Sequence, residues 1–144
     1  MLVALLSLSC LASNAAAQHS HGRRNTAALE YESIPAHNAV LAHAPEDLVL
    51  RFSEYVRMMK FTLKANDTAS IALDFKFSMD ASRVFIQKLP ALPPAAEFYT
   101  AEWAALNVDN VIVYGLLRFA VGVDAKNPQT IIDARSFPSA PFLD

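Results

Sequence analysis

Short runs of alternating apolar and polar residues recur between residues 28 and 123, with turn-forming residues between them. In one of these runs Leu48, Leu50 and Phe52 alternate with other residues, as in a strand that buries one face. Two later runs contain Trp103 and Phe119, and we expect them to meet the first run in one core. The runs predicted to be strands are 28–33, 47–53, 59–66, 70–76, 82–88, 97–104 and 111–121.

This pattern predicts an all-β fold, a seven-stranded Ig-like or Greek-key β-sandwich. About seven short strands at this spacing, without a sustained helical period, are typical of two packed antiparallel sheets. Proline, asparagine and aspartate stand at the breaks, for example at Pro35, Pro45 and 66–68. These residues favour turns, and the chain has only three glycines to share that role.

The first 17 residues are predicted to be a secretory signal peptide. An apolar run over 2–11 is followed by the small residues 15–17, as at a signal cleavage site, although the usual positive charge at the start is missing. The run is too short to span a bilayer, and no later segment qualifies. The only cysteine, Cys10, lies in this segment, so the mature chain is expected to contain no disulfide.

The remaining chain divides into three parts. Residues 18–27 are polar and aperiodic and are predicted to form a mobile arm, and residues 28–123 form the sandwich. Residues 124–144 contain three prolines and are predicted to be an extended tail, packed on the edge of the sandwich.

Composition excludes several classes of function. Of the 144 residues, 53% are hydrophobic and 18% are charged, which is typical of a folded domain and not of a disordered chain. The formal net charge of -2 gives no long-range attraction to nucleic acid or to anionic lipid. The chain has no G-x-S-x-G, H-E-x-x-H or glycine-rich phosphate motif, so we do not expect an enzyme.

Several motifs together identify a family resemblance. They are Ala-Pro-Glu-Asp-Leu-Val-Leu-Arg-Phe-Ser-Glu at 44–54, Tyr-Thr-Ala-Glu-Trp at 99–103, Val-Asp-Asn at 108–110, Gly115 and Phe-Ala-Val at 119–121. In order and spacing they resemble the CopC-type copper-resistance proteins of the bacterial periplasm, over Ala28 to Val123. The resemblance implies a β-sandwich, periplasmic localisation, a copper ion as ligand, and an inner-membrane copper transporter as a candidate partner.

In that family, copper(II) is typically held by an N-terminal histidine and an Asp-x-His motif before the last strand. Asp109 matches the aspartate of the motif, but Val111 occupies the place of its histidine. Ala27 falls where the spacing from Pro35 places the N-terminal histidine. Asp109 followed by Asn110 is also good turn chemistry, so Asp109 is either a copper ligand or a turn residue.

The arm offers replacement ligands, His19 and His21. If cleavage leaves Ala17 first, His19 is third from the free amine, and its imidazole can complete a square plane around copper(II) with the amine and two amides. If Gln18 is first, this register is lost and the glutamine can cyclise. The alternative is a solvated arm with incidental histidines.

Other copper ligands fit the pattern less well. His37 and His43 lie singly in a turn-rich stretch, where histidine is usually polar surface. Thioethers prefer copper(I), but Met58, Met59 and Met79 do not form a methionine-rich segment. We therefore expect Cu²⁺ in preference to Cu⁺, held by His19 and His21 with Asp109 as an outer partner. The alternative function is a metal-free structural or protein-interaction module on the same sandwich.

Overall fold

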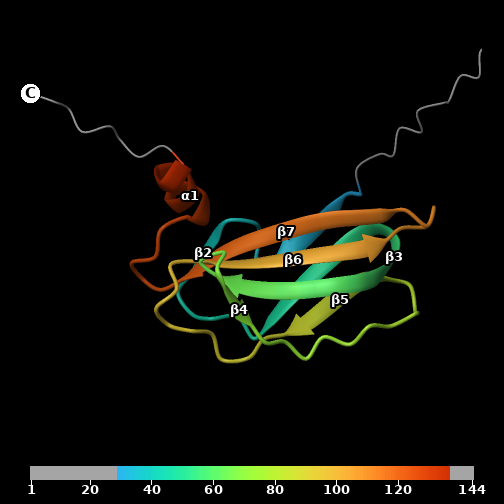
Figure 1. Ribbon diagram of the computed structural model, residues 1–144, viewed down its shortest axis with the longest axis horizontal. Helices are drawn as coiled ribbons and strands as arrows, with labels where there is room; N and C mark the ends of the chain where they lie inside the picture. The colour runs from blue at the N-terminus through green and yellow to red at the C-terminus, as the bar shows by residue number, and fades with distance from the viewer. Residues whose placement is uncertain (1–28, 137–144) are drawn as a thin grey trace, which may run out of the picture.

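The computed structural model describes residues 29–136, which form two layers of β-strands with one short helix at one end (Figure 1). The strands are β1 (Tyr31–Ile34), β2 (Ala39–Leu41), β3 (Asp47–Ala65), β4 (Ala69–Ile71), β5 (Ser82–Lys88), β6 (Tyr99–Leu106) and β7 (Ile112–Val121), and the helix is α1 (Pro128–Ser136). The predicted signal peptide and arm lie outside the described residues. The prediction of a β-sandwich is confirmed.

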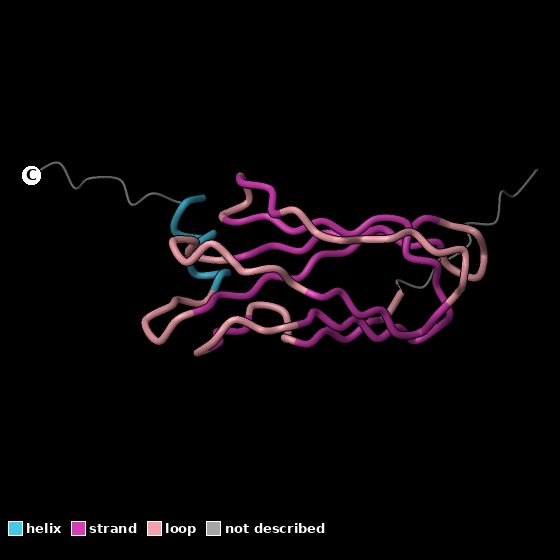
Figure 2. Tube along the Cα trace, turned by 90° about the horizontal axis from the view of Figure 1, so that it is seen from below, coloured by secondary structure: helices cyan, strands magenta, loops and turns pink. Residues whose placement is uncertain are grey.

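The long strand β3 belongs to both layers. Its first half pairs with β1 on one side and β5 on the other, which gives the three-stranded layer. Its second half pairs with β6 and β4, and β6 continues through β7 to β2. All of these pairs are antiparallel except that of β2 with β7. Figure 2 shows the two layers edge-on, with the helix at one end.

The buried face of β3 follows the predicted alternation in its first half. Leu48, Leu50 and Phe52 point into the core, as expected from the sequence. The register shifts between Arg51 and Val56, and again between Met58 and Lys60. Such bulges bend a strand and insert an extra residue, and here they allow one chain to pass from one layer to the other. The sequence instead predicts two strands with a break at residues 54–58.

Three further predictions need correction. The run 70–76 pairs only as far as Ile71, and residues 72–78 belong to no strand. The short strand β2 was not predicted. The tail predicted to be extended contains α1, which begins with an asparagine cap because Asn127 Oδ1 accepts a hydrogen bond from the Gln129 N–H at 2.8 Å. Pro128 at the first helical position fits this start.

Trp103 of β6 connects the two layers at the centre of the core. Its ring packs edge-on against Tyr31 and Phe52 of the other layer, with centroids 5.0 and 5.2 Å away. Gly115 lies directly across on β7, and a Cβ there would be 2.2 Å from Trp103 Cζ2. The indole therefore occupies the space above a residue that must have no side chain.

We predict that Trp103→Ala lowers the free energy of unfolding by about 3–5 kcal/mol, as for other large aromatic residues truncated in a core. Gly115→Ala should also destabilise the fold, because the new methyl group collides with the indole. In the double variant the collision is gone, so the two losses should not add. Denaturant unfolding of the four proteins measures this, with Val123→Ala, at an 88% exposed position, as a near-neutral control. Additive losses would contradict the direct contact.

Candidate metal centre

The turn between β6 and β7 carries the position at which the family motif places copper. Asn107 organises this turn: its Oδ1 accepts hydrogen bonds from the backbone N–H groups of Asp109 and Val111, at 3.1 and 2.8 Å. Its own N–H donates to the Val111 carbonyl at 3.0 Å, and the Asn110 N–H donates to the Asn107 carbonyl at 3.1 Å. Asn110 adopts φ 58°, a left-handed conformation that asparagine tolerates. The turn is thus closed by one asparagine side chain.

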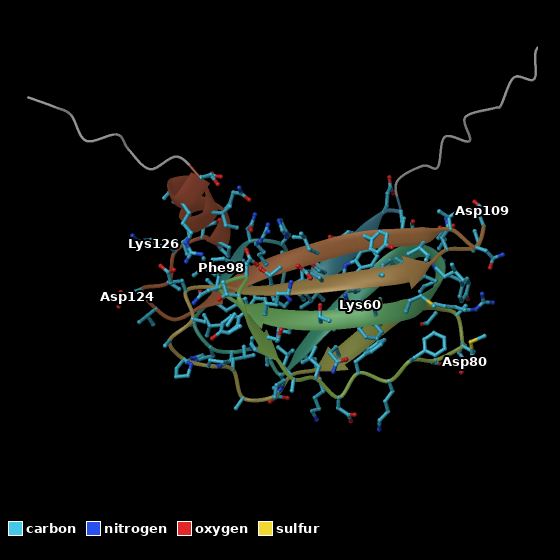
Figure 3. All side chains as sticks on the ribbon, in the orientation of Figure 1. Lys60, Asp80, Phe98, Asp109, Asp124 and Lys126 are labelled. Carbon is cyan, nitrogen blue, oxygen red and sulfur yellow. The ribbon has the colours of Figure 1, made fainter. Side chains whose placement is uncertain are left out.

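Asp109 lies exposed at the tip of this turn, at the end of the sandwich opposite Asp124 and Lys126 (Figure 3). No ion pair joins it to another described residue. Val111 is 38% exposed beside it and offers an apolar side chain where a histidine would offer a nitrogen. Both acceptor sites of Asn107 Oδ1 are already used by backbone N–H groups. Asp109 is therefore an exposed carboxylate in a turn that Asn107 holds, with an apolar side chain two residues further on.

Within residues 29–136, no group of three histidine, cysteine, aspartate or glutamate side chains is placed to hold a metal ion. The predicted ligands His19 and His21 lie outside the described residues. The structure therefore places only Asp109 of the three predicted ligands, and places it on the tip of a closed turn.

His37 has a structural contact toward the other end of β7. Its Nδ1 accepts a hydrogen bond from the Arg118 N–H at 3.2 Å, next to the point where Asn38 N–H donates to the Arg118 carbonyl at 2.7 Å. Burial, together with the positive charge of Arg118, holds the pKa of His37 below its usual value. His43 is exposed in the loop between β2 and β3. His37 therefore helps to seat the β1–β2 loop on β7.

The methionines separate in the fold. Met58 is 7% exposed and belongs to the core, whereas Met59, at the second bulge of β3, is 40% exposed. Met79 is 71% exposed in the segment before β5, and its carbonyl accepts a hydrogen bond from Arg57 Nε at 3.0 Å. Adjacent residues of a strand point to opposite faces, which is why Met58 and Met59 do not form a shared thioether site.

Sequence reasoning missed the role of Asn107. The signal was present in the sequence. Asn107 stands between two apolar runs, two residues before Asp109 and four before Val111. Asparagine side chains in such a place commonly bond the backbone N–H groups that follow.

Comparisons with known proteins agree with the fold. The family model of the CopC domain matches residues 31–122. CopC from Methylosinus trichosporium OB3b is similar in structure, with 22% identity and a TM-score of 0.54, over 66% of this chain and 92% of that one. PcoC, a methionine-rich copper resistance protein from Escherichia coli, has 23% identity and a TM-score of 0.50, over 66% of this chain and 99% of that one.

These likenesses define the class of the molecule as a CopC-type β-sandwich. Because the family model matches well over half of its residues, the chain belongs to the CopC domain family. A comparison with curated proteins finds no match. Among residues 29–136, no helix has the length and apolar character needed to cross a bilayer.

The hydrogen bond of His37 leads to a prediction about pH. A histidine whose pKa is lower in the folded state than in the unfolded chain binds more protons when unfolded, so stability should fall as pH drops through and below about 6.5. Protonation also removes the Nδ1 lone pair that accepts from Arg118. His37→Gln should flatten this part of the profile of unfolding free energy against pH, and His43→Gln, at an exposed loop position, should not. Identical profiles for both variants and the unaltered chain would exclude His37 as the source.

Proposed function

We propose that this CopC-family protein is exported and binds copper(II) through its N-terminal arm, with His19 and His21 as the main ligands and Asp109 as an outer partner. Family membership is the observation that carries the proposal. Among residues 29–136 no group of three histidine, cysteine, aspartate or glutamate side chains is placed to hold a metal ion, which supports a search for ligands in the arm. His19 and His21 are the only histidines there, and imidazole nitrogen suits copper(II).

Export is part of the same proposal and is supported by the apolar run and small residues of 1–17. An exported copper protein would bind or deliver the ion on the far side of the inner membrane, with a copper transporter as a candidate partner. N-terminal sequencing of the exported protein decides whether Ala17 or Gln18 is first, and therefore whether His19 stands third from a free amine.

A second candidate function, a metal-free interaction or structural module, is favoured by the β6–β7 turn. Val111 replaces the family histidine, and Asn107 closes the turn through hydrogen bonds that do not involve an ion. The turn is thus complete without copper. Two experiments separate the two functions.

The first experiment restores the missing ligand of the family motif. Val111→His should raise the affinity for copper(II), because Asn107 holds the backbone of Asp109 and Val111 in one turn and a histidine would add a nitrogen next to the carboxylate. Calorimetric titration with copper(II) measures the change. Val123→His adds a histidine at an 88% exposed position beyond the other end of β7 and is the matched control. If both variants gain equally, Asp109 has no role in copper binding.

The second experiment removes the arm. Deleting residues 18–27, or replacing both His19 and His21 by alanine, should abolish copper(II) binding, while the circular dichroism of the sandwich stays unchanged because the arm precedes β1. Binding to the unaltered chain should weaken as pH falls below about 6.5, since protons compete for imidazole. His43→Ala is the control and should change little. Undiminished binding without the arm would place the ligands elsewhere, and no binding by the unaltered chain would favour the module.

A further inference from the structure

The larger layer consists of β2, β4, β6, β7 and the second half of β3. Its face away from the core is covered by other parts of the chain near the start of β6, and it is exposed to solvent farther along β6. Alternation along β6 places Phe98, Thr100, Glu102 and Ala104 on the face opposite the core residues Tyr99, Ala101, Trp103 and Ala105. Phe98 and Thr100 are nevertheless 0% and 1% exposed. Beyond them lies an open hollow of about 370 Å³, here called the β6–β7 basin, lined mainly by Lys60, Glu102, Ala104, Tyr114, Gly115 and Leu116.

The helix α1 ends at the covered part of this face. The Arg135 guanidinium stacks over the Phe98 ring, 5.3 Å from its centroid, and forms an ion pair with Glu97. At the other end of the helix, Asn127 Nδ2 donates to the Asn38 carbonyl at 3.0 Å. The C-terminal end of α1 is therefore fixed beside the start of β6, and residues 137–144 follow it in the sequence.

The basin combines an apolar floor with an available positive charge. Ala104 is 5% exposed at its floor, and Tyr114, 76% exposed, stands at its side. Lys64 pairs with Glu102 at 3.0 Å, but no carboxylate of the described residues lies within ion-pair distance of Lys60. Figure 3 shows Lys60 on the same layer as Phe98, toward the middle of the strands. The basin thus fits an apolar side chain that is followed closely by a carboxylate.

We propose that residues 137–144 of the same chain occupy the β6–β7 basin, with Phe142 over Ala104 and the Asp144 side chain near Lys60. The sequence Phe-Pro-Ser-Ala-Pro-Phe-Leu-Asp supplies aromatic, aliphatic and acidic groups in the required order. The reach also fits. Phe98, just before β6, and Ala104 on it are six residues apart, about 20 Å in extended chain. Phe142 follows Ser136 by six residues, also about 20 Å when extended. Pro138 and Pro141 favour an extended course for the residues before them.

The proposal is tested by nuclear magnetic resonance on the full chain. It predicts nuclear Overhauser contacts between the Phe142 ring protons and the methyl groups of Ala104 and Leu116. Phe142→Ala should abolish these contacts and shift both methyl signals, whereas Phe77→Ala, at a half-exposed position outside the basin, should leave them unchanged. Unshifted methyl signals in Phe142→Ala would overturn the proposal.

Charge reversal tests the second contact. Lys60→Glu should reduce the docked fraction about threefold, as expected for loss of a surface ion pair. When Phe142→Ala has already removed the docked segment, Lys60→Glu should add only its own local shift to the Leu116 methyl signal. Lys88→Glu makes the same change of charge on the other layer and is the control. Equal effects of the two reversals would overturn the role of Lys60.

A third experiment shows whether the segment in the basin comes from the same chain or from a second copy. A mixture of isotope-labelled and unlabelled chains should show the Phe142 contacts only within one chain, at every protein concentration. Contacts between chains, or methyl shifts that grow with concentration, would assign the basin to the segment of a second copy and overturn docking within one chain.

Discussion

The fold depends on one strand that serves both layers of the sandwich. β3 runs for 19 residues, and four other strands, β1, β4, β5 and β6, pair with it directly. Its core residues fall on even numbers from Leu48 to Met58 and on odd numbers from Phe61 to Ala65. A regular strand cannot change this parity, because its side chains alternate strictly. The bulge before Lys60 changes it, and so keeps an apolar face toward the core on both sides of the bend.

The contact between Trp103 and Gly115 then fixes the register of β6 and β7, the two strands joined by the turn that carries Asp109. A shift of β7 by one residue along β6 would place a residue with a side chain opposite Trp103. At that place a Cβ would lie only 2.2 Å from the indole atom Cζ2, too close to be accommodated. The register of this hairpin also determines which residues form its turn. The position of Asp109 thus follows from the packing of Trp103 and Gly115, each six residues away along the chain, and from the hydrogen bonds of Asn107.

The sequence predicts those elements whose pattern is local. β5 has the predicted bounds of 82–88 because a turn and a proline-rich stretch enclose its alternation. The continuity of β3 was missed because Ser53, Glu54 and Tyr55 interrupt the apolar pattern where the strand bends, between the segment paired up to Phe52 and the segment paired from Val56 onward. The three-residue β2 is too short to show a period, and its parallel pairing with β7 is purely tertiary. For α1 the signal existed, since Asn127 and Pro128 form a cap and first turn.

At the site, the family motif located Asp109 and the substitution at Val111, but residue types alone could not show that Asn107 closes the turn. Fold and metal binding place different demands on this chain. The sandwich requires the bend of β3 and the glycine under Trp103, and neither involves the side chain of Asp109 or Val111. Copper binding by the motif requires donor atoms at two exposed positions of the turn, one of which is now apolar. Because the backbone geometry there is held by an asparagine, the loss of a donor leaves the fold intact, and membership of the family does not by itself fix the place of a copper ion.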